Sequence, residues 1–265
     1  MTANPLRRGL LACAGLGLLA SGTVRAVTPN AFTVAAASDL KFALEEVVEE
    51  FVRSGGARPR LVFGSSGNFY SQILQGAPFH VFMSADEAFV FKLAQAGKAM
   101  DQGRLYAYGR IGILVPKQGR VAADPELRDL RAALHDGRLS KFSIANPAHA
   151  PYGMRAQEAL ERVGLWERIR PFLVYGENVS QAAQFALSGS AQGGIVAYSL
   201  ARAPEISARG DFALIAQTWH QPLAQRVVVL RQAPVAAVQF YDYLRNPAAQ
   251  QIMMRFGFEM PGSLR

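Results

Sequence analysis

Two short stretches combine hydroxyl side chains with the start of a helix. Ser38 stands in Ala-Ala-Ala-Ser-Asp-Leu (35–40), and Ser65 and Ser66 stand in Phe-Gly-Ser-Ser-Gly-Asn (63–68). Each stretch follows an apolar run typical of a strand and precedes apolar residues at helical spacing. The first turn of a helix leaves backbone N–H groups unpaired and carries partial positive charge. Two such turns facing one point form an anion site without Lys or Arg, so the pattern predicts binding of a small tetrahedral oxyanion.

Each turn also has a purely structural interpretation. Serine is among the residues preferred at helix N-caps, and Gly-Ser-Ser-Gly is an ordinary turn sequence. A single turn of this kind therefore indicates only a helix start. The functional interpretation depends on what the rest of the chain places beside it.

The residues that an enzyme or a metal site needs are not combined in this sequence. Ser38 and Ser66 have no neighbouring histidine to act as a base. The chain has no Gly-x-Ser-x-Gly elbow and no Gly-Lys-Ser phosphate loop. Its histidines lack the spacing of metal ligands; they are His80, His135, His149 and His220. We therefore expect a binding protein and not an enzyme.

Strands and helices alternate along the chain, and they must position the two turns. Apolar runs typical of strands stand at 32–34, 61–63, 81–83, 111–115, 142–145, 172–174, 194–197 and 227–230. This alternation favours an α/β fold with largely parallel sheets flanked by helices. Ligands of such sheets lie at the carboxyl ends of strands, where helices begin. Four candidates fall there, two in each half of the chain, which predicts a cleft between two lobes: Ser38, Ser66, Tyr152 and Val179.

The first 26 residues have the pattern of a signal peptide. Arg7 and Arg8 precede an apolar stretch, 9–22, that is too short to span a bilayer, and Val24-Arg25-Ala26 fits a cleavage site. A lipid anchor at Cys13, the only cysteine, is a less favoured alternative because the apolar stretch continues past it. We expect a mature chain that begins at Val27 and is exported to the periplasm.

The charge balance is modestly basic. Removal of residues 1–26 takes away three Arg and no acidic residue, which lowers the net charge from +8 to +5. The remaining Arg residues are scattered, so no nucleic-acid partner is implied. A positive field helps to collect anions from dilute solution.

An ordered set of motifs resembles the molybdate-binding proteins of bacterial ABC transporters, which are type II periplasmic substrate-binding proteins. The resemblance covers essentially the whole mature chain. Its motifs are Ala-Ala-Ala-Ser (35–38), Gly-Ser-Ser-Gly (64–67), Gly-Ala-Pro-Phe (76–79), Met-Ser-Ala-Asp (83–86), Asn-Pro to Pro-Tyr-Gly (146–153), Gly-Glu-Asn-Val (176–179), Gly-Ile-Val (194–196), Phe-Tyr-Asp-Tyr-Leu (240–244) and Phe-Gly-Phe (256–258).

The resemblance implies a two-lobe periplasmic binding protein, each lobe a mixed, mostly parallel sheet flanked by helices. Lobe 1 is expected at 27–110 plus 222–265 and lobe 2 at 111–221, joined by hinge strands at 111–115 and 227–230. The implied function is capture of molybdate or tungstate and delivery to the permease of an ABC importer in the inner membrane. The resemblance implies no cofactor, and we expect a monomer.

The resemblance also implies how the oxyanion is held. Ser38 and Ser66 each offer a hydroxyl and a backbone N–H, while Tyr152 and Val179 each offer a backbone N–H. A metal enters only as the molybdenum of the oxyanion, which is bound through these same residues. Ser65, beside Ser66, is a weaker candidate.

Three positions depart from the family pattern. Some members place a ligating Tyr directly after Gly-Ile-Val; here Ala197 stands there and Tyr198 follows, which on a strand turns the side chain to the other face. Asp39 stands beside Ser38 where a neutral residue is usual. We expect its N–H to face the anion and its carboxylate to point away. His80 replaces an Asp, and the sequence offers no reason for that change.

Two other functions share parts of this pattern. Phosphate often carries a proton at neutral pH and needs an acceptor, which Asp39 offers, so phosphate is the main alternative oxyanion. Sulfate is smaller, so pocket size is expected to discriminate against it. The effector domain of a transcription regulator shares the fold. The export signal and the absence of an N-terminal DNA-binding segment in this sequence argue against that alternative.

Overall fold

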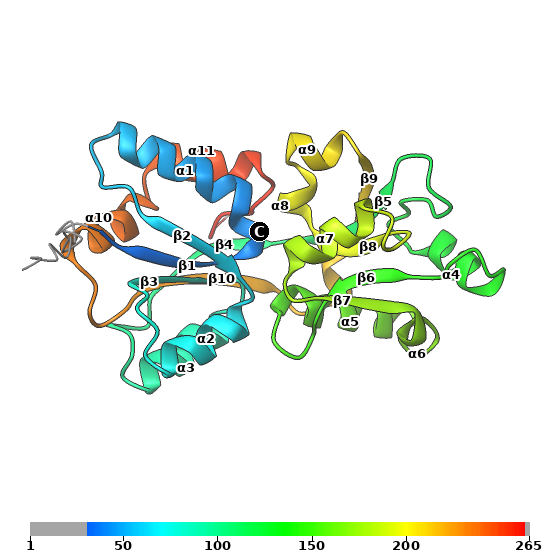
Figure 1. Ribbon diagram of the computed structural model, residues 1–265, viewed down its shortest axis with the longest axis horizontal. Helices are drawn as coiled ribbons and strands as arrows, with labels where there is room; N and C mark the ends of the chain where they lie inside the picture. The colour runs from blue at the N-terminus through cyan, green and yellow to red at the C-terminus, as the bar shows by residue number, and fades with distance from the viewer. Residues whose placement is uncertain (1–30, 263–265) are drawn as a thin grey trace, which may run out of the picture.

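The computed structural model describes residues 31–262, and nothing predicted for residues 1–26 falls within them. Two five-stranded sheets lie side by side, each flanked by helices (Figure 1). The two-lobe α/β fold predicted from the sequence is confirmed. Below, the first lobe means residues 31–110 and 222–262, and the second lobe means residues 111–221.

The first sheet has the order β2-β1-β3-β10-β4. β1 pairs in parallel with β2 and β3, whereas β10 runs antiparallel to β3 and β4. Four residues of β1 are buried because helices cover both faces of the sheet, which explains its continuous apolar run. The strands are β1 (Thr33–Ala37), β2 (Arg60–Gly64), β3 (Val81–Ser84), β4 (Arg104–Gly109) and β10 (Leu223–Val229).

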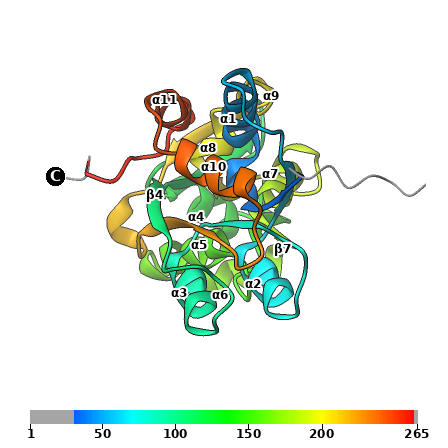
Figure 2. The ribbon, with the colours of Figure 1, turned by 90° about the vertical axis from the view of Figure 1, so that its left-hand side faces the viewer.

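Helices cover both faces of this sheet (Figures 1 and 2). On one face, α1 (Lys41–Arg53) shares a core with α10 (Val235–Tyr243) and α11 (Pro247–Arg255). α1 buries Leu44, Val47 and Phe51 at helical spacing, as its sequence pattern predicts. On the other face lie α2 (Ser66–Leu74) and α3 (Glu87–Gln95), which close a second core.

The second sheet has the order β7-β6-β8-β5-β9, with β6 parallel to β7 and β8 and with β5 antiparallel to β8 and β9. Its strands are β5 (Ile111–Pro116), β6 (Phe142–Ala145), β7 (Leu173–Gly176), β8 (Gly194–Ala197) and β9 (Gly210–Leu214). Its helices are α4 (Arg128–His135), α5 (Pro151–Arg162), α6 (Trp166–Ile169), α7 (Val179–Leu187), α8 (Tyr198–Ala201) and α9 (Pro204–Ser207). Short 3₁₀ turns are η1 (Ser38–Leu40), η2 (Arg170–Phe172) and η3 (Gln217–Trp219).

The predicted positions of the hinge strands are wrong by a few residues. Residues 111–115 pair only within the second sheet, and residues 227–229 pair only within the first. The chain crosses between the lobes at Arg110, which joins β4 to β5, and again along 215–222, which leads from β9 to β10. An apolar run shows where a strand is, but it does not show where the strand changes its pairing partner.

Candidate anion-binding site

A small cavity lies between the lobes, at the carboxyl ends of β1, β2 and β6. Its volume is about 10 Å³, which is room for one small group. The structure gathers Ser38, Asp39, Ser66, Tyr152 and Val179 around it, together with Ser65. The cavity is lined by Ala37, Ser38, Asp39, Gly64, Ser65, Ser66, Ala85, Ala150, Pro151, Tyr152, Asn178 and Val179.

Two of the helical turns at the cavity begin without a side-chain cap. Ala37 precedes η1 and Ala150 precedes α5, and neither side chain can accept from the first N–H groups. Pro151 occupies the first position of α5, so the Tyr152 amide is the first N–H of that helix. Groups left unpaired in this way favour an anion.

The other two helices at the cavity do have caps, but the caps leave the first amides unpaired. Ser65 Oγ accepts from the Asn68 N–H at 3.3 Å, and Asn178 Oδ1 accepts from the Gln181 N–H at 3.1 Å. Each cap thus satisfies the N–H at the third position of its helix, two residues beyond the amides of Ser66 and Val179.

The hydroxyl groups of Ser38 and Ser66 are oriented by backbone donors. The Ala85 N–H donates to Ser66 Oγ at 3.0 Å, and the Ser180 N–H of the other lobe donates to Ser38 Oγ at 3.3 Å. Among residues 31–262 neither hydroxyl donates to a protein acceptor, so its hydrogen is left to donate. Both serines are therefore equipped to donate to an anion in the cavity.

Asp39 is fully buried in the wall of the cavity, with 1% of its surface exposed. Its Oδ2 accepts from the Tyr152 hydroxyl at 2.9 Å and from Gln225 Nε2 at 2.7 Å. Burial raises the pKa of the Asp39 carboxyl to about 6, although hydrogen bonds from Gln225, from Tyr152 and from the backbone of Asp39 and Leu40 act to lower it. Among residues 31–262, its other oxygen, Oδ1, makes no hydrogen bond of normal geometry.

Sequence reasoning missed two residues of this cluster, Gln225 and Tyr106. The Tyr106 hydroxyl donates to Gln225 Oε1 at 2.6 Å, and Gln225 is wholly buried. Burial, together with the charge of Asp39, raises the pKa of Tyr106 and Tyr152 well above the ordinary tyrosine value, so both hydroxyls remain protonated donors. A glutamine in the largely apolar strand 223–229 was the available signal, because buried polar groups need partners.

Hydrogen bonds join the two lobes beside the cavity. Ser180 Oγ donates to the Ser38 carbonyl and Ser199 Oγ to the Asp39 carbonyl, both at 2.8 Å. The structure is therefore a closed one. Further contacts between the lobes are Gly67 N–H to His149 O (2.9 Å), Ser65 Oγ with His149 Nδ1 (2.8 Å) and the ion pair Arg155–Asp86 (3.0 Å).

Tyr198 and His80 lie away from the cavity. The Tyr198 ring stacks on Phe212, with 5.4 Å between ring centroids, and it opens α8. His80 Nδ1 accepts from the Thr33 N–H at 2.9 Å at the opposite end of β3, and burial lowers the pKa of His80. A neutral histidine here extends the pairing of β1 with β3 at the amino ends of the two strands, which accounts for a residue that the sequence left unexplained.

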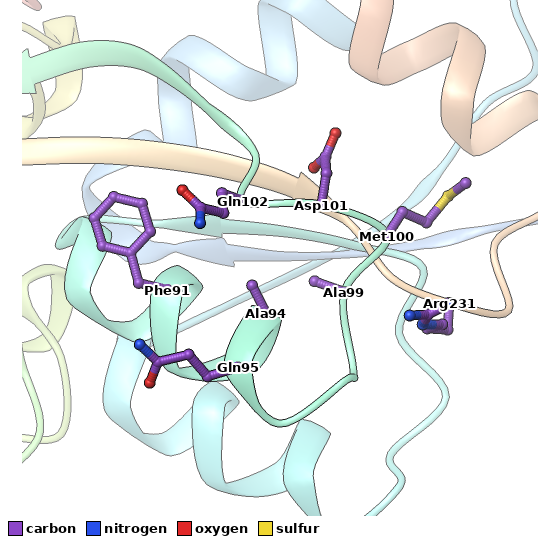
Figure 3. Close-up of a pocket in the computed structure, with 8 residues that line it drawn as sticks. All are labelled: Phe91, Ala94, Gln95, Ala99, Met100, Asp101, Gln102 and Arg231. Atoms are coloured by element: carbon purple, nitrogen blue, oxygen red, sulfur yellow. The ribbon is translucent and has the colours of Figure 1, made fainter.

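A larger hollow of about 540 Å³ lies in the first lobe, beside α3 (Figure 3). Figure 3 shows its side chains spread around the rim, with no group of donors converging on one point. We assign no function to it. Among residues 31–262, no group of three or more His, Cys, Asp or Glu side chains is placed to hold a metal ion, and no helix is long and apolar enough to cross a membrane.

The fold and the donor-lined cavity between the lobes define a two-lobed solute-binding protein. A family model described as bacterial extracellular solute-binding protein matches residues 32–259. The chain is 35% identical over 260 residues to "Molybdate-binding protein ModA" of Rhodobacter capsulatus, covering 96% of both chains, and 32% identical to that of Azotobacter vinelandii, covering 94% of this chain and 96% of the relative. The chain belongs to the bacterial extracellular solute-binding proteins, in the branch of the molybdate-binding proteins.

Solved structures agree with this assignment. The periplasmic molybdate-binding protein of Azotobacter vinelandii has a TM-score of 0.79 and 27% identity, with 87% of this chain and 99% of that chain covered. The sulfate-binding protein SubI of Mycobacterium tuberculosis has a TM-score of 0.70 at 15% identity, which shows a shared fold and no more.

Proposed function

We propose that this chain is a periplasmic binding protein that captures molybdate between its lobes and delivers it to an ABC importer. One observation carries the proposal: a cavity with room for one small group is walled by hydroxyl and amide donors from both lobes. The relatives named molybdate-binding proteins support the choice of anion.

The proposed ligands divide between the lobes. Ser38 and Ser66 donate from their hydroxyl and backbone N–H groups, and Asp39 donates its N–H. Tyr152 and Val179 donate backbone N–H groups from the second lobe. Molybdate and tungstate present four acceptor oxygens and no proton, so a wall of donors satisfies either of them. Ser65, which caps α2 and bonds His149, plays a supporting part.

Phosphate is the second candidate, and one observation favours it. A phosphate proton needs an acceptor, and Asp39 Oδ1 is buried without a hydrogen bond of normal geometry among residues 31–262. The relatives and the number of converging donors make molybdate the first choice.

We further propose that residues 1–26 direct export to the periplasm and that the lobe boundaries fall at 110/111 and 221/222. The partner is an inner-membrane permease, to which the closed, loaded monomer docks. The protein is no enzyme, and neither a cofactor nor nucleic acid takes part.

Calorimetric titration of the chain from Val27 with molybdate, tungstate, sulfate and phosphate tests the proposal. We expect one molybdate or tungstate per chain and much weaker binding of sulfate and phosphate. Tight phosphate binding with no heat from molybdate would establish the second candidate instead.

A further inference from the structure

A buried chain of hydrogen bonds links the lobes next to the cavity. Three of its members, Tyr106, Asp39 and Gln225, belong to the first lobe, and Tyr152 belongs to the second. Gln225 Nε2 lies 2.7 Å from Asp39 Oδ2 and 3.0 Å from the Tyr152 hydroxyl oxygen, and the same hydroxyl lies 2.9 Å from Asp39 Oδ2. Tyr106 and Gln225 do not line the cavity.

The donors and acceptors of this cluster fit together in one way. The Tyr106 hydroxyl donates to Gln225 Oε1, which fixes the amide so that both Nε2 hydrogens face the other members. One of these hydrogens goes to Asp39 Oδ2 and the other to the Tyr152 oxygen. Tyr152 then gives its own hydrogen to Asp39. Because no hydrogen is left over, the cluster favours one arrangement of the two lobes.

The backbone around the cluster leaves space for its side chains. A Cβ atom at Gly109 would overlap the Tyr152 hydroxyl and would lie 2.7 Å from Gln225 Nε2. The pairing of β10 with β4 shifts register between Gln225 and Arg226. Irregularities of this kind re-aim a side chain, and here the side chain is that of Gln225.

We propose that Tyr106, Gln225 and Asp39 form, with the Tyr152 hydroxyl, a latch that holds the lobes closed and thereby sets how slowly a captured anion leaves. This inference rests on the proposed function. Tyr106 and Gln225 are positioning residues, since they act through Asp39 and Tyr152.

Tyr152 connects the latch to the anion. Its backbone N–H is a proposed anion donor, while its side chain reaches across to the first lobe. The bonds of Tyr152 to Asp39 and Gln225 exist only when the lobes are closed, and an enclosed anion leaves only when they open. A weakened latch therefore raises the population of the open form and speeds release. Association starts from the open form and depends much less on the latch.

Tyr152→Phe is the direct test, because it removes the hydroxyl and keeps the backbone N–H. We expect molybdate to dissociate roughly ten- to a hundred-fold faster, as a lost hydrogen bond to a charged group predicts. The association rate is expected to stay within about three-fold, as changes in affinity among related variants lie mostly in dissociation. The ratio of molybdate to sulfate affinity is expected to be unchanged. Tyr175→Phe, which removes an exposed hydroxyl in β7, is the matched control and should release molybdate at the parent rate.

A double-mutant cycle distinguishes a latch from independent structural roles. Gln225→Met breaks the same cluster. The dissociation rate of the double variant is therefore expected to rise by much less than the product of the two single increases. If Tyr152→Phe does not fold, Tyr106→Phe serves instead, because it removes a hydroxyl group that does not line the cavity. This variant is also expected to release molybdate faster than the parent.

The outcomes separate this inference from the proposed function. A parent protein that binds no molybdate refutes the proposed function. Molybdate binding with parent dissociation rates in Tyr152→Phe and Tyr106→Phe overturns the latch alone. So does a changed ratio of molybdate to sulfate affinity in Tyr152→Phe, because the hydroxyl would then contact the anion itself.

Discussion

Ser38 and Ser66 are the residues whose side chains the structure leaves most clearly free to donate. Each oxygen accepts from a backbone N–H, and neither hydroxyl donates to an acceptor among residues 31–262, so each hydroxyl hydrogen is available to the cavity. Replacement of either residue by Ala removes one donor to a buried charge, a loss of about 1.5–3 kcal/mol. We expect molybdate affinity to fall roughly ten- to a hundred-fold in each variant, measured by calorimetry. Parent affinity in both would place the anion outside this cavity.

Asp39 gives the free protein a pH dependence of known sign. Burial raises the pKa of its carboxyl from 3.8 to about 6 in the folded state. Because the folded pKa lies above the unfolded one, the contribution of Asp39 favours folding below about pH 4 and is lost as the pH rises through about 6. Asp39→Asn removes this titration.

The measurement is a pair of urea denaturation series without anion, one for each protein. The free energy of unfolding of Asp39→Asn minus that of the parent is expected to rise by about 2 kcal/mol between pH 4 and pH 7.5. Acidic residues on the surface titrate alike in both proteins, so they cancel in the difference. A difference that stays flat with pH would contradict the assigned pKa.

At the scale of elements, the first turn of α2 sits directly against the second lobe. The Gly67 N–H donates to the His149 carbonyl, and a Cβ at Gly67 would lie 2.5 Å from that same oxygen. A methyl group at Gly67 would clash with backbone atoms of the other lobe. Within α2 itself it should be tolerated, because alanine is a better helix former than glycine by about 1 kcal/mol.

Gly67→Ala is therefore expected to impede closure while leaving the first lobe intact. We expect weaker molybdate binding together with a melting temperature of the anion-free protein that is equal to or above that of the parent. Calorimetry and a thermal melt measure the two effects. Parent affinity would show that the lobes close without this contact, and a lowered melting temperature would show that the glycine serves α2 itself.

At the scale of the whole molecule, the proposed donors are divided between the lobes, so an open form offers only some of them at once. An anion that contacts both lobes must favour the closed form, by the difference between its affinities for the two forms. Hinge closure of this kind is known for periplasmic binding proteins. Molybdate is therefore expected to compact the chain and to raise its melting temperature, whereas sulfate at equal concentration does much less.

Small-angle scattering and thermal melts with each anion check this expectation. Equal responses to molybdate and sulfate would count against selection by size. Tight binding without compaction would mean that the two lobes are already closed in the anion-free chain. The latch residues would then hold the lobes closed without a ligand.

The sequence by itself determined the features that are local. Apolar spacing located most strands and long helices, because burial on one side of an element repeats with that element's own period. The same reasoning placed Ser38, Ser66, Tyr152 and Val179 at strand ends that meet at one cavity, since helix starts follow strands along the chain. Strands β4 and β9 escaped it, as did the short helices α6, α8 and α9.

Only the tertiary structure decided which distant residues touch. Asp39 meets Tyr152 and Gln225 across separations of 113 and 186 positions, and no periodic pattern records such a contact. The positions where the chain crosses between lobes depend on which sheet each strand joins. The position of the Tyr198 side chain depends on the stacking of its ring on Phe212. These features arise from the packing of one lobe on another, where the geometry of the whole chain sets each distance.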